Sequence, residues 1–144
     1  MNAVLYYSYS GSTRRLAKAR AEAEGADLFE IREAKKRSFI GTFLVGAPQG
    51  MHRKASTILP LSIDWEKYDC IFLFCPVWAG YPAPAFNAAL ALIPHGMEVS
   101  VVLCSGGGET PASKEGTIEL IRQAGLKFGF YEDIRTGAPP KPHA

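Results

Sequence analysis

The chain of 144 residues lacks the features of several large protein classes. Its three cysteines, Cys70, Cys75 and Cys104, form no C-x-x-C pair, which excludes a disulfide framework and a structural zinc site, so no metal is expected. No apolar run approaches the roughly 20 residues that span a bilayer. The opening residues MNAVLYYSYS lack the basic region and cleavage site of a signal peptide. We therefore expect a cytoplasmic protein with buried thiols and no membrane partner.

Common nucleotide-binding and catalytic motifs are also missing. There is no G-x-x-x-x-G-K-[ST] loop, and the glycines at 106–108 do not fit G-x-G-x-x-G. Cys104 lacks the arginine that a cysteine phosphatase would need at position 110, and Ser10 follows a tyrosine instead of the glycine of a nucleophile elbow. The catalytic residues thus stay unknown. The weak acid or base candidates are Glu109, Tyr81 and His52.

Positive charge is concentrated in the first part of the chain. Residues 1–58 hold ten Lys/Arg and five Asp/Glu, a net charge of +5, whereas residues 59–144 hold six and nine, a net charge of −3. A basic half suits phosphate-bearing small molecules or an acidic partner, and it also suits a solvated helix face. No basic block exceeds KKR at 35–37, so nucleic acid is not expected as a partner.

The hydrophobic pattern predicts alternating strands and helices in one domain over residues 1–144, with a proline-rich tail at 136–144. Expected strands are 3–7, 27–31, 70–77, 98–104 and, more weakly, 127–134; expected helices are 12–25, 83–93 and 110–125. Between 34 and 60 we expect one helix or two short ones, with breaks at Gly41, Gly46, Pro48 and Gly50. The first, third and fourth strands are nearly continuously apolar instead of alternating, as in a parallel sheet covered on both faces.

In such a sheet, ligands bind beyond the carboxyl ends of the strands. The loops at 8–13, 76–84 and 105–110 share that edge. The first of them, SYSGST, has small hydroxyl residues and a glycine before a helix, where backbone N–H groups can bind an anion. An ordinary capped turn explains the same residues equally well.

These segments together resemble the flavodoxin family. Residues 8–13 are similar to the family's [ST]-x-[ST]-G-x-T loop, and YDCIFLFCPVWAG at 68–80 is similar to its strand-Pro-x-Trp-x-Gly segment. The resemblance covers residues 3 to about 134 and implies an α/β fold: a three-layer sandwich around a five-stranded parallel sheet of order 2-1-3-4-5. It also implies flavin mononucleotide (FMN) as the cofactor, at the switch point of the sheet.

The resemblance implies three groups of cofactor-binding residues. The phosphate site consists of Ser8, Tyr9, Ser10, Gly11, Ser12 and Thr13. The flavin ring is contacted by Pro76, Val77, Trp78, Ala79 and Gly80, with Trp78 stacked on it. Backbone N–H groups of Ser105, Gly106, Gly107 and Gly108 approach its pyrimidine edge. Arg14 and Arg15 are expected to point to solvent.

Three departures from the family shape the functional prediction. The chain is slightly basic, its loop SGGGETPAS carries no aromatic residue to cover the flavin, and the last helix is missing after Ile134. An open flavin face suits hydride exchange, so we predict an FMN-dependent oxidoreductase that reduces a quinone or small electrophile with NAD(P)H. The alternatives are a one-electron carrier that serves a redox partner protein, and a flavin-free binding module.

The missing helix also bears on assembly. Alternate side chains of CIFLFC and VSVVLC are expected to lie bare on one face of the sheet, in an apolar patch unusual for a monomer. A two-fold homodimer would bury this patch, and a tail folded back over it is the alternative.

Overall fold

A computed structural model describes residues 1–38 and 42–136, except the side chain of Phe43. Its strands are β1 (Asn2–Tyr7), β2 (Asp27–Ile31), β3 (Cys70–Trp78), β4 (Tyr81–Pro82), β5 (Glu98–Ser105) and β6 (Lys127–Arg135). Its helices are α1 (Ser12–Glu24), the π-helix η1 (Thr42–Gly46), α3 (Ala47–Met51), the 3-10 helix η2 (Trp65–Lys67), α4 (Pro84–Leu92) and α5 (Lys114–Gln123). All five predicted strands and all three predicted helices are present, with shifts only at their ends.

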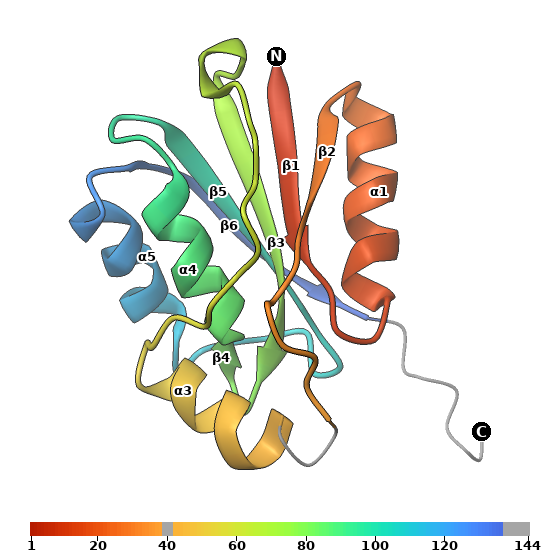
Figure 1. The fold of residues 1–144 in the computed structure, drawn as a ribbon, viewed down its shortest axis with the longest axis vertical. Helices are drawn as coiled ribbons and strands as arrows, with labels where there is room; N and C mark the ends of the chain where they lie inside the picture. Colours follow the sequence, from red (N-terminus) through yellow and green to blue (C-terminus); the bar gives the residue numbers. More distant parts are fainter. Residues whose placement is uncertain (39–41, 137–144) are drawn as a thin grey trace.

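The strands form one sheet in the order β2-β1-β3-β5-β6, with β4 paired to β3. The five long strands are parallel. Counted along the chain without the short β4, this is the predicted order 2-1-3-4-5, so the expected fold class is confirmed. The carboxyl ends of the strands meet at one edge of the sheet, where α3 and β4 also lie (Figure 1). Below, this edge is called the carboxyl edge.

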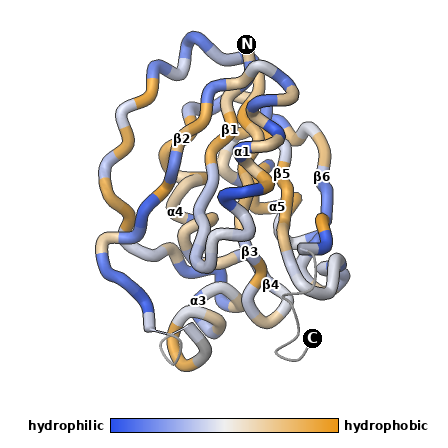
Figure 2. Tube along the Cα trace, turned by 90° about the vertical axis from the view of Figure 1, so that its right-hand side faces the viewer, coloured by the Kyte–Doolittle hydropathy of each residue, from blue (hydrophilic) through white to orange (hydrophobic). Residues whose placement is uncertain are grey.

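Helices cover both faces of the sheet, as the continuous apolar strands predict. On one face, α4 and α5 pack with alternate strand residues such as Leu5, Leu73 and Leu103 (Figure 1). On the other face α1 packs through Ala17 and Ala21 on Val4, Phe72 and neighbouring residues. The orange strands at the centre of Figure 2 show this apolar core.

The expected bare patch beside α1 is absent from the described residues. The side chains in question are all buried: Cys70, Phe72, Phe74, Ser100, Val102 and Cys104. The guanidinium of Arg20 lies 5.6 Å from the centre of the Phe74 ring and binds Glu132 of β6 at 2.9 Å. The ring of Phe130, also on β6, lies 5.7 Å from that of Phe72. One helix, a long side chain and the last strand thus cover the face, and the homodimer stays a prediction without this support.

The segment between β2 and β3 departs most from the sequence prediction. Gly46, Pro48 and Gly50, expected as breaks, lie inside the continuous helical run of η1 and α3, whereas Gly41 lies outside the described residues. Pro48 lies at the start of α3, directly after the π-helical turn, where the change of helix type accommodates a residue without an N–H. The two glycines allow close packing: a Cβ at Gly50 would lie 2.8 Å from the Pro82 carbonyl oxygen.

All three cysteines are buried and unpaired, as predicted. Burial raises the pKa of Cys70 and of Cys104 to about 11, which keeps both thiols protonated near neutral pH. No helix in the described part of the chain is long and apolar enough to cross a membrane.

Candidate functional site

The β1–α1 loop turns the chain from the sheet into a helix. Gly11 has a φ of 104°, which a residue with a Cβ rarely adopts. Its N–H donates to Ser8 Oγ at 3.0 Å, and its carbonyl accepts the first helical bond from the Arg15 N–H at 3.1 Å. The N–H groups of residues 12–14 precede this bond and therefore have no partner within the helix. The loop thus offers several backbone donors and the positive end of a helix dipole to an anion.

The hydroxyl groups of this loop differ in exposure. Tyr9 and Ser10 are exposed, and Ser8 and Ser12 are partly buried. Thr13 is only 2% exposed, and burial raises the pKa of the Cys104 thiol, an effect that the Thr13 hydroxyl partly offsets. The Thr13 side chain is therefore a core element, and the exposed Ser10 is the hydroxyl best placed to meet a ligand.

The two arginines after the loop behave differently from each other. Arg15 is exposed, as predicted. Arg14 is half-exposed but not free: its guanidinium binds Glu30 at 2.5 Å and the Tyr6 hydroxyl at 3.3 Å. The prediction that Arg14 points to solvent overlooked Glu30, which reaches it from the neighbouring strand β2.

The predicted ring-binding segment is mostly strand. Pro76, Val77 and Trp78 belong to β3, because Pro76 pairs with Cys104 of β5 and the next two residues pair with β4. Only Ala79 and Gly80 form a turn, both with positive φ (52° and 86°), as in a two-residue hairpin. The loop predicted for residues 76–84 is therefore a short hairpin, which fixes Trp78 on a strand end instead of a mobile loop.

Trp78 is partly buried between aromatic and charged neighbours. The rings of Tyr7 and Tyr9 meet it edge-on, with centres 6.1 and 5.8 Å away. The guanidinium of Arg37 lies over the ring at 5.2 Å, and a Cβ at Gly46 would come within 2.8 Å of a ring carbon. The segment between β2 and β3 thus contacts Trp78 through Arg37 and Gly46, and Arg37 covers one face of the Trp78 ring.

The loop after β5 completes the carboxyl edge. Ser105 Oγ accepts the Gly108 N–H at 2.9 Å, the same arrangement as Ser8 and Gly11 in the first loop. Gly106 and Gly107 are exposed, and a Cβ on either would meet nothing within 4 Å. Ser113, just before α5, donates to the Gly80 carbonyl at 2.6 Å and so links this region to the β3–β4 turn. The structure therefore brings the three predicted loops to one sheet edge.

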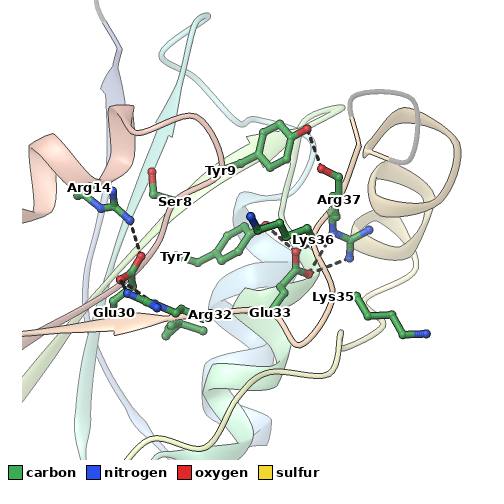
Figure 3. A pocket seen from close by; sticks show the side chains of 11 residues that line it. Tyr7, Ser8, Tyr9, Arg14, Glu30, Arg32, Glu33, Lys35, Lys36 and Arg37 are labelled. Atoms are coloured by element: carbon green, nitrogen blue, oxygen red, sulfur yellow. Dashed lines mark hydrogen bonds and ion pairs between the residues drawn. The ribbon is translucent and has the colours of Figure 1, made fainter.

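A buried ion pair lies beside this edge, and no sequence pattern predicted it. Arg37 and Glu33 form three hydrogen bonds of 2.8–3.1 Å, and their side chains are only 12% and 7% exposed. The Tyr7 hydroxyl donates to Glu33 at 2.6 Å (Figure 3). Arg37 also donates to Gln49 at 3.2 Å. Burial, followed by the bond to Glu33, raises the pKa of Tyr7. Burial lowers the pKa of Arg37, but the bonds to Glu33 outweigh it and raise that pKa overall.

The weak acid or base candidates are not gathered at one point. Glu109 and His52 are exposed, and Tyr81 is partly buried beneath the guanidinium of Arg53 at 5.1 Å. Within the described ranges, no group of three or more His, Cys, Asp and Glu side chains is placed to hold a metal.

Solved structures with the same fold are flavoproteins and flavodoxins. A flavoprotein from Lactobacillus acidophilus, crystallised in complex with FMN, is 25% identical, with a TM-score of 0.76 and coverage of 90% of each chain. The apo-form of the flavoprotein from that organism has the same identity, a TM-score of 0.65 and coverage of 92% of this chain and 91% of its own. The two-electron reduced flavodoxin of Megasphaera elsdenii is 17% identical, with a TM-score of 0.54 and coverage of 96% and 88%. No family model and no curated protein sequence matches the chain. The fold is therefore flavodoxin-like.

Proposed function

We propose that this chain binds FMN at the carboxyl edge of its sheet and acts as an FMN-dependent oxidoreductase that reduces a quinone or small electrophile with NAD(P)H. The observation that carries the proposal is the β1–α1 loop, where Gly11 has a positive φ and the N–H groups of residues 12–14, at the start of α1, have no partner within the helix. The FMN complex of the similar Lactobacillus acidophilus flavoprotein supports the choice of ligand.

The residues at this edge fit the chemical groups of FMN. The phosphate dianion matches the N–H groups at the start of α1 and the hydroxyl of Ser10. Trp78 supplies aromatic surface for the ring, and the exposed glycines 106 and 107 leave room for backbone contact with its polar edge. When bound, FMN supplies hydride transfer. The chain's own residues bind and orient it.

The loop after β5 favours an enzyme over a carrier protein. It has no aromatic side chain, and its glycines leave space beside them. A second substrate can therefore approach from that side, as hydride transfer between stacked rings requires. With FMN bound, NADPH or NADH oxidation should rise when a quinone is added. A protein that binds FMN but oxidises neither donor with any quinone would contradict the enzymatic part of the proposal.

The phosphate assignment predicts a difference between two flavins. Apo-protein should bind FMN more tightly than riboflavin, which lacks the phosphate. Ser10→Ala should weaken FMN binding by about 1 kcal/mol, about fivefold, through one lost hydrogen bond, and leave riboflavin binding unchanged. Fluorescence titration of both flavins measures this, with the exposed Ser62→Ala as the matched control. Equal affinities of the parent for both flavins would show that the loop does not hold the phosphate.

The ring assignment predicts which tryptophan responds to FMN. Trp78 ends β3, whereas Trp65, the only other tryptophan, lies before its first residue, so the length of the strand separates them. Tryptophan fluorescence should fall on FMN binding, and Trp78→Phe should remove most of this quenching. Trp65→Phe should leave it in place, and the opposite pattern would move the ring to the other end of the sheet.

A further inference from the structure

A cavity of about 390 Å³ lies between the β1–α1 loop and the segment that follows β2. One wall carries Ser8 and Tyr9, and the other carries Arg32, Glu33 and residues 35–37 (Figure 3). The Tyr9 hydroxyl donates to the Arg37 carbonyl at 3.2 Å and joins the two walls. The blue stretch leading from β2 toward α3 in Figure 2 shows how hydrophilic the second wall is. The volume lies within the usual range for small-molecule sites.

The lining of the cavity is strongly basic. Five basic side chains (Arg14, Arg32, Lys35, Lys36 and Arg37) face two acidic ones, which leaves a net charge of +3. Both carboxylates already form ion pairs with arginines of the lining. Glu30 binds Arg14 and Arg32, and these bonds hold its pKa below the ordinary value although burial alone would raise it. Glu33 binds Arg37.

Two lysines remain as uncompensated positive charges. Across the described residues, neither Lys35 nor Lys36 has a carboxylate within 4.0 Å. Their directions differ in Figure 3: Lys36 extends past Tyr7 toward Ser8, and Lys35 turns away. Lys36 therefore brings its ammonium group to the cavity opposite Arg14 and Arg32, where an anion would meet positive charge on two sides.

The cavity adjoins the proposed ring site. Tyr7, Tyr9 and Arg37 line it, and each of them contacts Trp78. A ligand in the cavity would thus be a close neighbour of a molecule held at Trp78. It would also be distinct from the phosphate of FMN if that phosphate lies at the start of α1.

We propose that this cavity binds a phosphomonoester of the electron donor, so that the protein prefers NADPH, which carries a 2′-phosphate, to NADH. This inference rests on the proposed function. Guanidinium groups bind phosphate oxygens in pairs, and a lysine adds a mobile point charge. Lys36 is then a specificity-determining residue.

The test compares NADP⁺ with NAD⁺ on the FMN-loaded protein by calorimetric titration. The parent should bind NADP⁺ about tenfold more tightly, since each charged hydrogen bond to the phosphate adds to affinity. Lys36→Gln should remove most of this preference, and Lys36→Arg should retain it. Lys18→Gln, the same charge change on the exposed face of α1, should have no effect.

Two outcomes would overturn the inference. One is equal binding of NADP⁺ and NAD⁺ by the parent. The other is a Lys36→Gln variant that loses FMN affinity but not riboflavin affinity, because the cavity would then hold the phosphate of FMN itself. A protein that binds no FMN but still binds NADP⁺ through Lys36 would instead refute the proposed function and leave the anion site standing.

Discussion

Replacing Glu33 with alanine should lower the free energy of unfolding by about 3–5 kcal/mol, a large fraction of the stability of a small protein. The change leaves the Arg37 guanidinium buried without a counter-charge and the Tyr7 hydroxyl without its acceptor. A buried, unpaired charge costs far more than the ion pair itself contributes. Urea unfolding followed by circular dichroism measures the loss.

Glu30→Ala is the matched control. Glu30 also binds two arginines, but those arginines are 53% and 69% exposed, so water replaces much of the lost interaction. We expect a cost of about 1 kcal/mol or less. If the two variants lost similar stability, Glu33 and Arg37 would be solvated in the folded protein, and the buried network beside Trp78 would not exist as described.

Phe74→Ala should cost about 3–5 kcal/mol through the cavity it leaves. Phe74 is fully buried on the α1 face of the sheet, beneath the guanidinium of Arg20. The same substitution at Phe130 on that face should cost about 1 kcal/mol or less, because its ring is 40% exposed. Thermal and urea unfolding of both variants at matched concentrations gives the comparison.

This pair also tests the predicted homodimer. In a monomer, the free energy of unfolding that each of the two variants loses is independent of protein concentration. If a second copy covers this face, Phe130→Ala should cost nearly as much as Phe74→Ala, and the midpoint of unfolding should rise with protein concentration. Losses that do not depend on concentration would contradict a dimer through this face.

The strands could be predicted because their signal is local. Runs such as CIFLFCPV and EVSVVLC are apolar almost throughout and do not alternate, as expected for a parallel strand that is covered on both faces. The last strand gave a weaker signal because it contains an irregularity. One extra residue near Gly129 interrupts its pairing with β5, and the buried Ser100 hydroxyl accepts the displaced Phe130 N–H at 3.0 Å. The short strand β4 was not predicted, because two residues, one of them proline, are too few to show the residue pattern of a strand.

The site was predictable only in part, because some of its contacts join residues that are far apart in the sequence. The loop at 8–13 and the region around Trp78 stand out by residue type at fixed spacing. Glu33 and Arg37 did not, since they lie in an irregular segment where a spacing of four implies no contact. Their partners Tyr7, Gln49 and Trp78 come from three other elements, and only the folded chain brings them together.

The strand order has a consequence for folding kinetics. Strand β1 pairs with β2 across 24 residues of chain, and β5 pairs with β3 and β6 across 28–30 residues. Ala3 of β1, in contrast, pairs with Ile71 of β3, 68 positions away. Closing the longer loop costs about 0.8 kcal/mol more in chain entropy than closing one of 28 residues. The β2-β1 and β3-β5-β6 units therefore form more readily than the seam that joins them. The β1–α1 loop and Trp78 lie on opposite sides of this seam. A ligand bound by both therefore stabilises the β1–β3 pairing, which forms after the other pairings. We expect such a ligand to slow unfolding more than it speeds folding.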